Sequence, residues 1–366
     1  MSAPMSAAIP QQQCTANNGL MPRTQRQPLA ACTVLAALLS APLSCYAASD
    51  ITRRADVQQF AAAVAAEHNL SPAWVLAQLK PAKLLPVVKQ LVMPPAVGTA
   101  KNWAAYRARF VEPRRIAAGL AFWRANEPWL NQAQTRWGVP AQIVIGVIGV
   151  ETFFGQVTGN FAVLDALATL AFDFPTGRSD RSAFFRNELA ELLVIASHEK
   201  VNASTLKGSY AGAMGLPQFM PSSVNRWALD FDGDGHIDLR KSAADTIGSV
   251  AHYLAAFGWE ADLPTHFDVT PPDDAAQRAT LLAPDIVPSF TAAQMAALGA
   301  GLSVPAQAHT GLLALVELHN GGAPPSYVAG SKNFYVVTRY NWSSFYAMAV
   351  IELGAAIAQA RQDAAR

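Results

Sequence analysis

Cysteine is scarce in this 366-residue sequence, and all of it lies near the amino terminus. The three cysteines are Cys14, Cys32 and Cys45. If the segment that holds them is a leader that is removed, residues 48–366 contain no thiol, which excludes a disulfide framework and cysteine-based catalysis in the mature chain. A chain of that length can rely on a large hydrophobic core instead.

Charge is also scarce and nearly balanced. Only 14% of the residues are charged, and 27 Lys and Arg stand against 26 Asp and Glu, for a net charge of +1. Without an excess of basic residues the chain lacks the electrostatic footprint of a protein that binds a polyanion, so we expect no nucleic-acid partner. The hydrophobic fraction of 51% is that of an ordinary globular protein.

The first 47 residues have the pattern of a secretory signal peptide. Arg23 and Arg26 precede the apolar run LAACTVLAALLSAPLSCYA, and Cys45 and Ala47 stand at the −3 and −1 positions of a cleavage site. We therefore expect export and a mature protein, residues 48–366, that is soluble in the periplasm.

Two alternatives to cleavage stay open. The apolar run could anchor the chain in the membrane, although Pro42 interrupts it and it only just reaches spanning length. A lipid on Cys45 would instead tether the protein to the membrane as an outer-membrane lipoprotein.

The rest of the chain reads as mainly helical with a small β part. Ser71 and Pro72 have the residue types of a helix cap and first turn, within a stretch that is predicted to be helical from residue 50 to residue 95. Between about 260 and 331, Pro, Asp and Thr punctuate short apolar runs, which predicts a β-containing insertion. The segment after residue 332 is predicted to run from a strand into a helix.

One acid falls on an apolar helix face. Val144, Val147, Ile148 and Phe154 recur at the spacing of a helical stripe, and Glu151 lies on the same stripe. Burial disfavours the charged form of a carboxyl group, so we expect a raised pKa, as a general acid requires. The alternative is a structural Glu that caps or pairs inside the core.

A run of acids between residues 230 and 245 has the spacing of a calcium-binding loop. Gly235 takes the sharp turn at position 6, and Lys241 stands at position 12, where an EF-hand has a bidentate Glu. The next acid after position 12 is Asp245, so the loop would be longer than that of an EF-hand. The alternative interpretation is an acidic surface turn. The expected ligands, with the carbonyl at position 7, are Asp230, Asp232, Asp234, His236, Asp238 and Asp245.

Five blocks of sequence, in order, resemble the lytic murein transglycosylase B family. The resemblance covers roughly residues 103–354. The blocks are GVIGVETFFGQVTGN with LDALATLAFDFP, KGSYAGAMGLPQFMPSS, DFDGDGHIDL, IGSVAHYL, and NFYVVTRYN with SSFYAMAV.

The resemblance implies a mainly α (α+β) fold: a lysozyme-like core with an added helical subdomain and a small β subdomain. It implies action on peptidoglycan glycan strands in the periplasm. We also expect a monomer and, from the acidic loop, a structural Ca²⁺. Family members cleave the β-1,4 bond between N-acetylmuramic acid and N-acetylglucosamine without water. They use one catalytic Glu and close a 1,6-anhydro ring on the muramic acid.

Residue by residue, the resemblance places the catalytic acid at Glu151. Asp180 stands where the family often has an Arg, which implies weaker contacts to the acidic groups of the substrate. The substrate-binding residues that the resemblance implies are Tyr106, Arg181, Gln218, Tyr253, Tyr340, Asn341 and Tyr346.

A single Glu fits this reaction better than ordinary glycoside hydrolysis, which usually needs two carboxylates. The acids nearest in the sequence, Asp165 and Asp173, have no pattern that ties them to the face of Glu151. Two alternatives remain: a hydrolytic muramidase, and a non-catalytic, calcium-stabilised scaffold that binds peptidoglycan.

Overall fold

The structure, a computed structural model, describes residues 50–94 and 101–366. The signal-peptide and lipidation predictions therefore lie outside the described residues. Within these residues the fold is mainly helical with two small sheets, which confirms the predicted fold class. Buried side chains form three clusters, and each cluster defines one lobe of the molecule.

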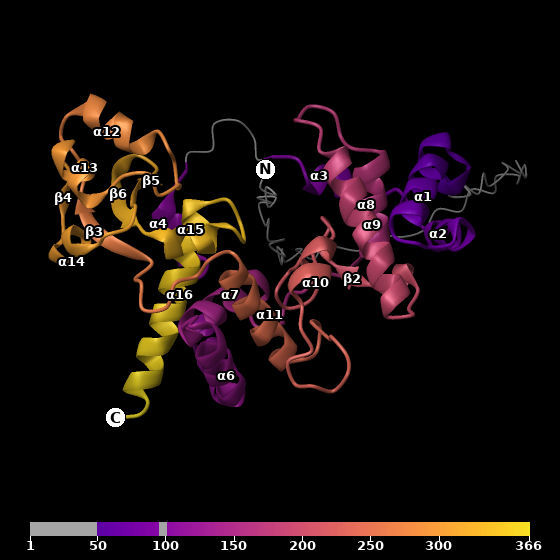
Figure 1. The fold of residues 1–366 in the computed structure, drawn as a ribbon, viewed down its shortest axis with the longest axis horizontal. Helices are drawn as coiled ribbons and strands as arrows, with labels where there is room; N and C mark the ends of the chain where they lie inside the picture. Colours follow the sequence, from indigo (N-terminus) through magenta and orange to yellow (C-terminus); the bar gives the residue numbers. More distant parts are fainter. Residues whose placement is uncertain (1–49, 95–100) are drawn as a thin grey trace, which may run out of the picture.

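The helical lobe lies at one end of the molecule (Figure 1). Ser71 accepts a hydrogen bond from the Trp74 amide and Pro72 opens the helix, as predicted. Its elements are η1 (Ile51–Arg53), α1 (Ala55–Glu67), α2 (Pro72–Leu79), α3 (Pro86–Leu91), α8 (Val163–Phe172), α9 (Ser182–His198) and η2 (Ala203–Thr205).

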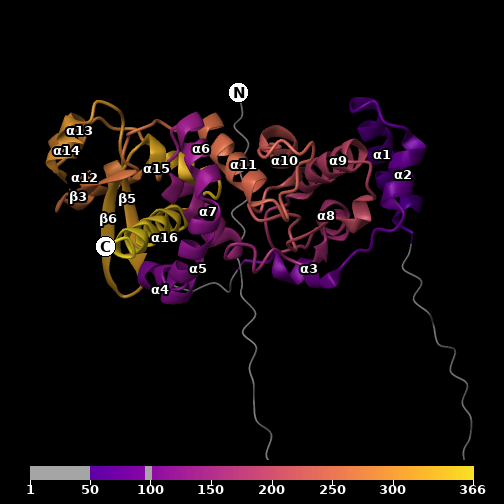
Figure 2. The same cartoon turned by 90° about the horizontal axis from the view of Figure 1, so that it is seen from below.

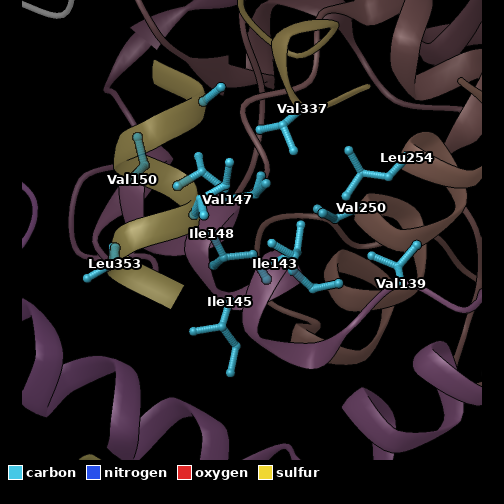
Figure 3. Packing of buried hydrophobic residues seen from close by; sticks show 14 of the residues in the cluster. Val139, Ile143, Ile145, Val147, Ile148, Val150, Val250, Leu254, Val337 and Leu353 are labelled. Atoms are coloured by element: carbon cyan, nitrogen blue, oxygen red, sulfur yellow. The ribbon is translucent and has the colours of Figure 1, made fainter. Parts of the chain in front are cut away.

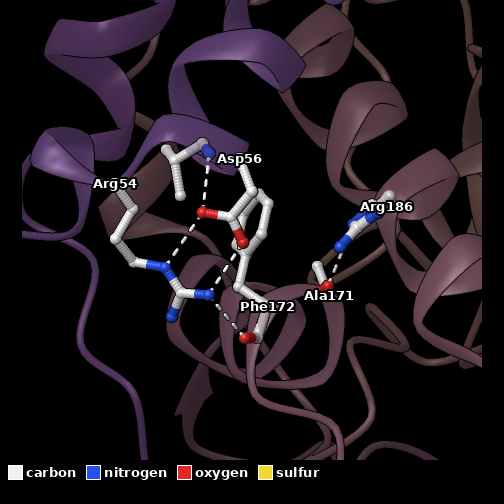
Figure 4. A network of polar contacts seen from close by, with 6 residues as sticks. Arg54, Asp56, Ala171, Phe172 and Arg186 are labelled. Carbon is white, nitrogen blue, oxygen red and sulfur yellow. Dashed lines mark hydrogen bonds and ion pairs between the residues drawn. The ribbon is translucent and has the colours of Figure 1, made fainter.

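Two arginines secure the end of α8 in this lobe. Arg54 donates to the carbonyl of Phe172 at 3.0 Å and pairs with Asp56, while Arg186 donates to the carbonyl of Ala171 at 3.1 Å (Figure 4). The last carbonyls of a helix lack partners within the helix, and cations there also complement its dipole. These contacts join α1 and α9 to α8.

The sheet lobe lies at the opposite end (Figures 1 and 2). Its four strands are antiparallel, in the order β4-β3-β6-β5. Its elements are β3 (His266–Thr270), α12 (Ala275–Leu282), α13 (Ala292–Ala297), β4 (Gly301–Leu302), α14 (Val304–Ala308), β5 (Ala314–Asn320) and β6 (Ala323–Gly330).

The central lobe lies between the other two (Figures 1 and 2). Two short strands, β1 (Phe161–Ala162) and β2 (Lys207–Gly208), and helix α10 (Pro221–Trp227) connect it to the helical lobe. Its own helices are α4 (Trp103–Ala108), α5 (Pro113–Ala125), α6 (Glu127–Trp137), α7 (Ala141–Thr152), α11 (Ala243–Ala256), α15 (Lys332–Thr338) and α16 (Ser344–Asp363).

The predicted strand after residue 332 was wrong, because this segment is helix α15. Its Phe, Tyr and Val residues favour strands when considered alone. However, the Ser331 side chain caps the helix by accepting from the Asn333 amide, and Phe334, Val336 and Val337 are all buried in the central lobe. Capping and tertiary packing outweigh the local preference.

Helix α7 is the centre of this lobe and differs from the predicted one-sided stripe. Of its twelve residues only Gln142 and Glu151 are not buried (Figure 3). The helix also ends at Thr152, so Phe154 lies beyond it, and both Phe153 and Phe154 adopt left-handed backbone conformations, with φ of 52° and 56°. A helix that is apolar all round is a core helix.

Candidate functional site

Helices α7 and α16 pack against each other without intervening side chains at two points. A Cβ on Gly146 would lie 2.2 Å from the Val350 carbonyl oxygen, and one on Gly354 would lie 2.1 Å from that of Gln142. Only glycine permits this approach. The close packing brings the first turn of α16 beside the last turn of α7, where Glu151 lies.

Glu151 is half-buried and accepts a short hydrogen bond. The Tyr346 hydroxyl, on α16, donates to Glu151 Oε1 at 2.6 Å. Burial raises the pKa of Glu151 to about 7, and the hydrogen bond from Tyr346 opposes part of that rise because it favours the carboxylate. Near neutral pH the group is therefore able both to give and to take a proton.

Four tyrosines surround this carboxyl group. The rings of Tyr340 and Tyr346 are stacked, with centroids 6.2 Å apart, and Tyr253 lies 4.9 Å from Tyr340. Burial raises the pKa of Tyr106 to about 12, and the charge of Glu151 adds to the rise. The pKa values of Tyr253, Tyr340 and Tyr346 also rise, first from burial and then with a contribution from Glu151. All four hydroxyls therefore stay protonated as hydrogen-bond donors.

The loop that carries Gln218 is tied to the end of α7. Thr152 Oγ1 donates to the Leu216 carbonyl at 3.0 Å, and Tyr340 donates to that of Pro217 at 2.6 Å. Gln218 has a left-handed backbone with φ of 51°. Its side-chain nitrogen Nε2 donates to the Gly215 carbonyl at 2.8 Å. These bonds place Gln218 beside the tyrosines.

Asn341 brings a polar atom to the same region. Its Oδ1 is buried and has no hydrogen-bond partner among the described residues. A buried acceptor without a partner is costly, so a ligand that donates to Asn341 would be favoured.

Arg181 belongs to the helical lobe, where it is the N-cap residue of α9. Its guanidinium lies 4.7 Å from the ring centroid of Phe184, a cation–π contact. The neighbouring Asp180 accepts from the amide of Ser182 at 2.8 Å. An acid here stabilises the first turn of α9, so Asp180 has a structural role.

Sequence reasoning missed Arg115, a buried cation under the end of α7. Its side chain donates to the Gly149 carbonyl at 2.6 Å and lies against the rings of Phe110 and Phe153, 5.1 and 4.5 Å from their centroids. A cation at a helix C-terminus stabilises it. The signal was available, because Arg115 shares a four-residue spacing with the buried Gly119 and Trp123 of α5.

The acids nearest to Glu151 in the sequence lie in the helical lobe. Asp165 accepts from the amide of Lys83 at 2.9 Å, and Asp173 pairs with Lys89 at 3.1 Å. They therefore bond to the chain around α3 rather than to Glu151.

The acidic loop brings three of its expected ligands together. Asp230, Asp232 and Asp245 each place a carboxylate oxygen within 4.8 Å of the others, and Asp245 is buried at the start of α11. Three hard oxygen donors at this spacing suit a calcium-sized cation. Asp245 is therefore the acid that joins Asp230 and Asp232 in this cluster, whereas Lys241 stands at position 12.

The other expected carboxylates lie outside this cluster and accept hydrogen bonds from nearby amides, as Asp230 also does from those of Gly233 and Gly235. Asp234 accepts from the His236 amide at 2.8 Å, and Asp238 accepts from the amides of Arg240 and Lys241, both at 3.0 Å. The Asp238 amide in turn donates to Asp245 at 2.8 Å, which holds the two halves of the loop together.

Comparisons with known proteins agree with this architecture. The family model of the transglycosylase SLT domain matches residues 52–355. The membrane-bound lytic murein transglycosylase B of Escherichia coli K12 is 39% identical over 325 residues, 85% of each chain.

Solved structures are similar as well. The soluble lytic transglycosylase SltB1 from Pseudomonas aeruginosa is 37% identical, with a TM-score of 0.75 over 84% of this chain and 99% of that one. The E. coli lytic transglycosylase SLT35 in complex with calcium is 37% identical, with a TM-score of 0.73 over 85% of this chain and 95% of that one. The chain therefore belongs to the lytic murein transglycosylase B family.

Proposed function

We propose that this protein is a peptidoglycan lytic transglycosylase that uses Glu151 alone as acid and then base. The observation that carries the proposal is the carboxyl group at the end of α7, with a pKa near 7 and a tyrosine as its hydrogen-bond partner. The names of its relatives support the class of reaction.

The reaction has two proton transfers. Protonated Glu151 gives its proton to the oxygen of the β-1,4 bond as that oxygen leaves C1 of N-acetylmuramic acid. The N-acetyl group of the substrate supports the positive charge at C1. The C6 hydroxyl then bonds to C1, its proton returns to Glu151, and the product is a 1,6-anhydro sugar.

The surrounding residues bind the glycan in this proposal. Aromatic rings cover the flat apolar faces of sugars. The hydroxyls of the tyrosines, the unsatisfied oxygen of Asn341 and the side-chain oxygen of Gln218 are hydrogen-bonding groups for sugar hydroxyls and acetamido groups. Arg181, which belongs to the helical lobe, would bind an acidic group of the substrate.

We also propose that the acidic loop holds a structural Ca²⁺. Asp230, Asp232 and Asp245 would be the core ligands, joined by Asp234, the His236 carbonyl and Asp238 when the loop closes on the ion. A relative has been solved in complex with calcium. The ion would supply stability to the loop beside α11 and take no part in bond cleavage.

We place the protein in the periplasm, where glycan strands of peptidoglycan are its partner. No helix within residues 50–94 and 101–366 is both long and apolar enough to span a membrane.

A turbidity assay on purified sacculi tests the enzyme against the scaffold alternative. The wild-type chain should clear the suspension, and Glu151→Gln should lower the rate by about 10² to 10⁴, because it keeps the shape but removes the proton. The matched control is Asp273→Asn, an exposed acid between β3 and α12, which should clear at the wild-type rate. Clearing by Glu151→Gln at that rate would refute the assignment of the acid.

A further inference from the structure

Thr152, the residue after Glu151, forms its shortest hydrogen bond outside its own helix. It is the last residue of α7 and is fully buried. A threonine inside a helix usually donates its hydroxyl proton to the carbonyl four residues earlier. That carbonyl, of Ile148, lies 3.4 Å from Thr152 Oγ1, whereas the Leu216 carbonyl lies at 3.0 Å. Because a hydroxyl has a single proton, the shorter bond shows that Thr152 donates to Leu216.

The same hydroxyl oxygen also accepts a hydrogen bond. The amide of Gly155, in the turn that follows α7, donates to it at 3.1 Å. A Cβ on Gly155 would lie 3.5 Å from Leu216 Cγ, so this turn is in contact with residues 215–218, here called the Gln218 loop. One hydroxyl group therefore joins three segments: the end of α7, the turn after it and the Gln218 loop.

The Gln218 loop is fixed on its far side by the acidic loop. The Leu216 amide donates to the Leu239 carbonyl at 2.8 Å. A Cβ on Gly215 would lie 2.5 Å from the same carbonyl oxygen, so only glycine allows this approach. With both the amide and the carbonyl of Leu216 bonded, the loop has little freedom to shift relative to α7.

The same loop is also connected to Glu151 through the tyrosines. Tyr340 donates to the Pro217 carbonyl at 2.6 Å, and its ring is stacked on that of Tyr346. Tyr346 in turn donates to Glu151 at 2.6 Å. The loop is therefore held against two consecutive residues of α7: against Glu151 by way of two aromatic rings, and against Thr152 directly.

A second buried threonine shows that burial alone does not require such a distant partner. Thr169, in α8 of the helical lobe, is also fully buried. Its hydroxyl donates to the Asp165 carbonyl, four residues earlier, at 2.6 Å and accepts from the Leu85 amide at 2.8 Å. Thr169 keeps the bond within its own helix, whereas Thr152 donates to a loop 64 residues away. The partner of Thr152 therefore indicates a role in placing that loop.

We propose that Thr152 is a positioning residue, whose hydroxyl holds the Gln218 loop against the end of α7 so that the acid and the glycan-binding loop keep one relative position. The proposal rests on the proposed function, because it assigns Thr152 to the same site. Misplacement of the reacting groups by about 1 Å can lower a rate by about 10²-fold. Loss of this hydroxyl should therefore appear in kcat.

The kinetic test replaces Thr152 by valine and by serine. Thr152→Val keeps the shape and removes the hydroxyl, so it should lower kcat on glycan strands about 10- to 100-fold. It should change KM less than about threefold, because the other binding residues are intact. Thr152→Ser loses a buried methyl group but keeps the hydroxyl, and should retain kcat within about threefold of the wild type. Equal losses of kcat in the two variants, or no loss in either, would overturn the proposal.

Thr169→Val is the matched control, because it removes a buried hydroxyl with the same pattern of bonds from the helical lobe. Both valine variants leave a buried carbonyl and a buried amide without a partner, so both should lower the melting temperature by about 2 to 4 °C. Only Thr152→Val should lose kcat. A loss of kcat as large in Thr169→Val would show that the hydroxyl of Thr152 acts through stability alone, which would overturn the proposal.

An NMR measurement tests the position of the loop without any bond cleavage. The side-chain nitrogen of Gln218 donates to the carbonyls of Gly215 and Thr158, at 2.8 and 3.2 Å, so its amide protons report on the loop. In chains labelled with ¹⁵N-glutamine, Thr152→Val should shift the Gln218 side-chain signals and Thr169→Val should leave them in place. Unchanged Gln218 signals in Thr152→Val would overturn the positioning role. A wild-type chain that cleaves no glycan, with the shift present in Thr152→Val, would overturn only the proposed function.

Discussion

At the scale of single residues, Glu151 shows what a helical pattern can and cannot reveal. Its spacing among apolar residues predicted burial and a raised pKa, and the structure gives a pKa of about 7 for that reason. Its partner Tyr346 is 195 residues away in the sequence. No local pattern connects the two, so only the family resemblance could place them in one site.

Removal of the Tyr346 hydroxyl should shift the pH dependence upward. The hydrogen bond from Tyr346 lowers the pKa of Glu151, so Tyr346→Phe should raise that pKa above about 7. The protonated acid then persists to higher pH, and the alkaline limb of the kcat/KM profile should move to higher pH while the maximum falls. A control variant, Tyr335→Phe, should leave the midpoint in place. A downward shift in Tyr346→Phe would contradict the assigned role of the hydrogen bond.

At the scale of elements, local sequence preferences predicted a helix cap correctly, but they failed where tertiary packing determines the secondary structure. Ser71 with Pro72 predicted the start of α2, whereas the β-prone residues of α15 predicted a strand and form a helix. The residue at which α7 ends could not be predicted from the local sequence either, because it depends on Arg115 from α5 and on two phenylalanines with left-handed backbones. The acidic loop lies between these cases, since its spacing is local but Asp245, which joins Asp230 and Asp232 in the carboxylate cluster, is on α11.

Calcium should stabilise the fold through that loop. A ligand that binds only the folded chain adds RT ln(1 + [L]/Kd) to the free energy of unfolding, about 2.7 kcal/mol at a hundred times Kd. Thermal melts with calcium and with chelator should therefore differ by several degrees. Asp232→Asn should abolish the difference, and Asp273→Asn, outside the loop, should preserve it. Identical melting temperatures of the wild-type chain with calcium and with chelator would contradict the proposed calcium site.

At the scale of the whole molecule, the sequence predicted the class of fold through resemblance, but the arrangement of three lobes depends on packing. Gly146 and Gly354 bring α16 against α7, and nothing in a single-sequence pattern says which helix a glycine will meet. The same packing brings the sheet lobe to Tyr106 and Trp342, which line a cavity together with residues of β5.

Export should leave a mature chain that begins at Ala48. The cleavage pattern at Cys45 and Ala47 is the basis of this prediction. Intact-mass measurement of the exported protein checks it directly. A diacylglyceryl adduct on Cys45, or a retained leader, would contradict the soluble form and support the tethered one.

The central claim is that the reaction takes place without water, and the mass of the products tests it most directly. Attack by the C6 hydroxyl leaves muropeptides with anhydro ends, one water lighter than the products of hydrolysis, because no solvent molecule enters the product. Mass spectrometry of sacculi digested by the wild-type chain should show the lighter ends, and Glu151→Gln should release them about 10² to 10⁴ times more slowly. Reducing ends that carry the additional water would show a hydrolytic muramidase and contradict the account.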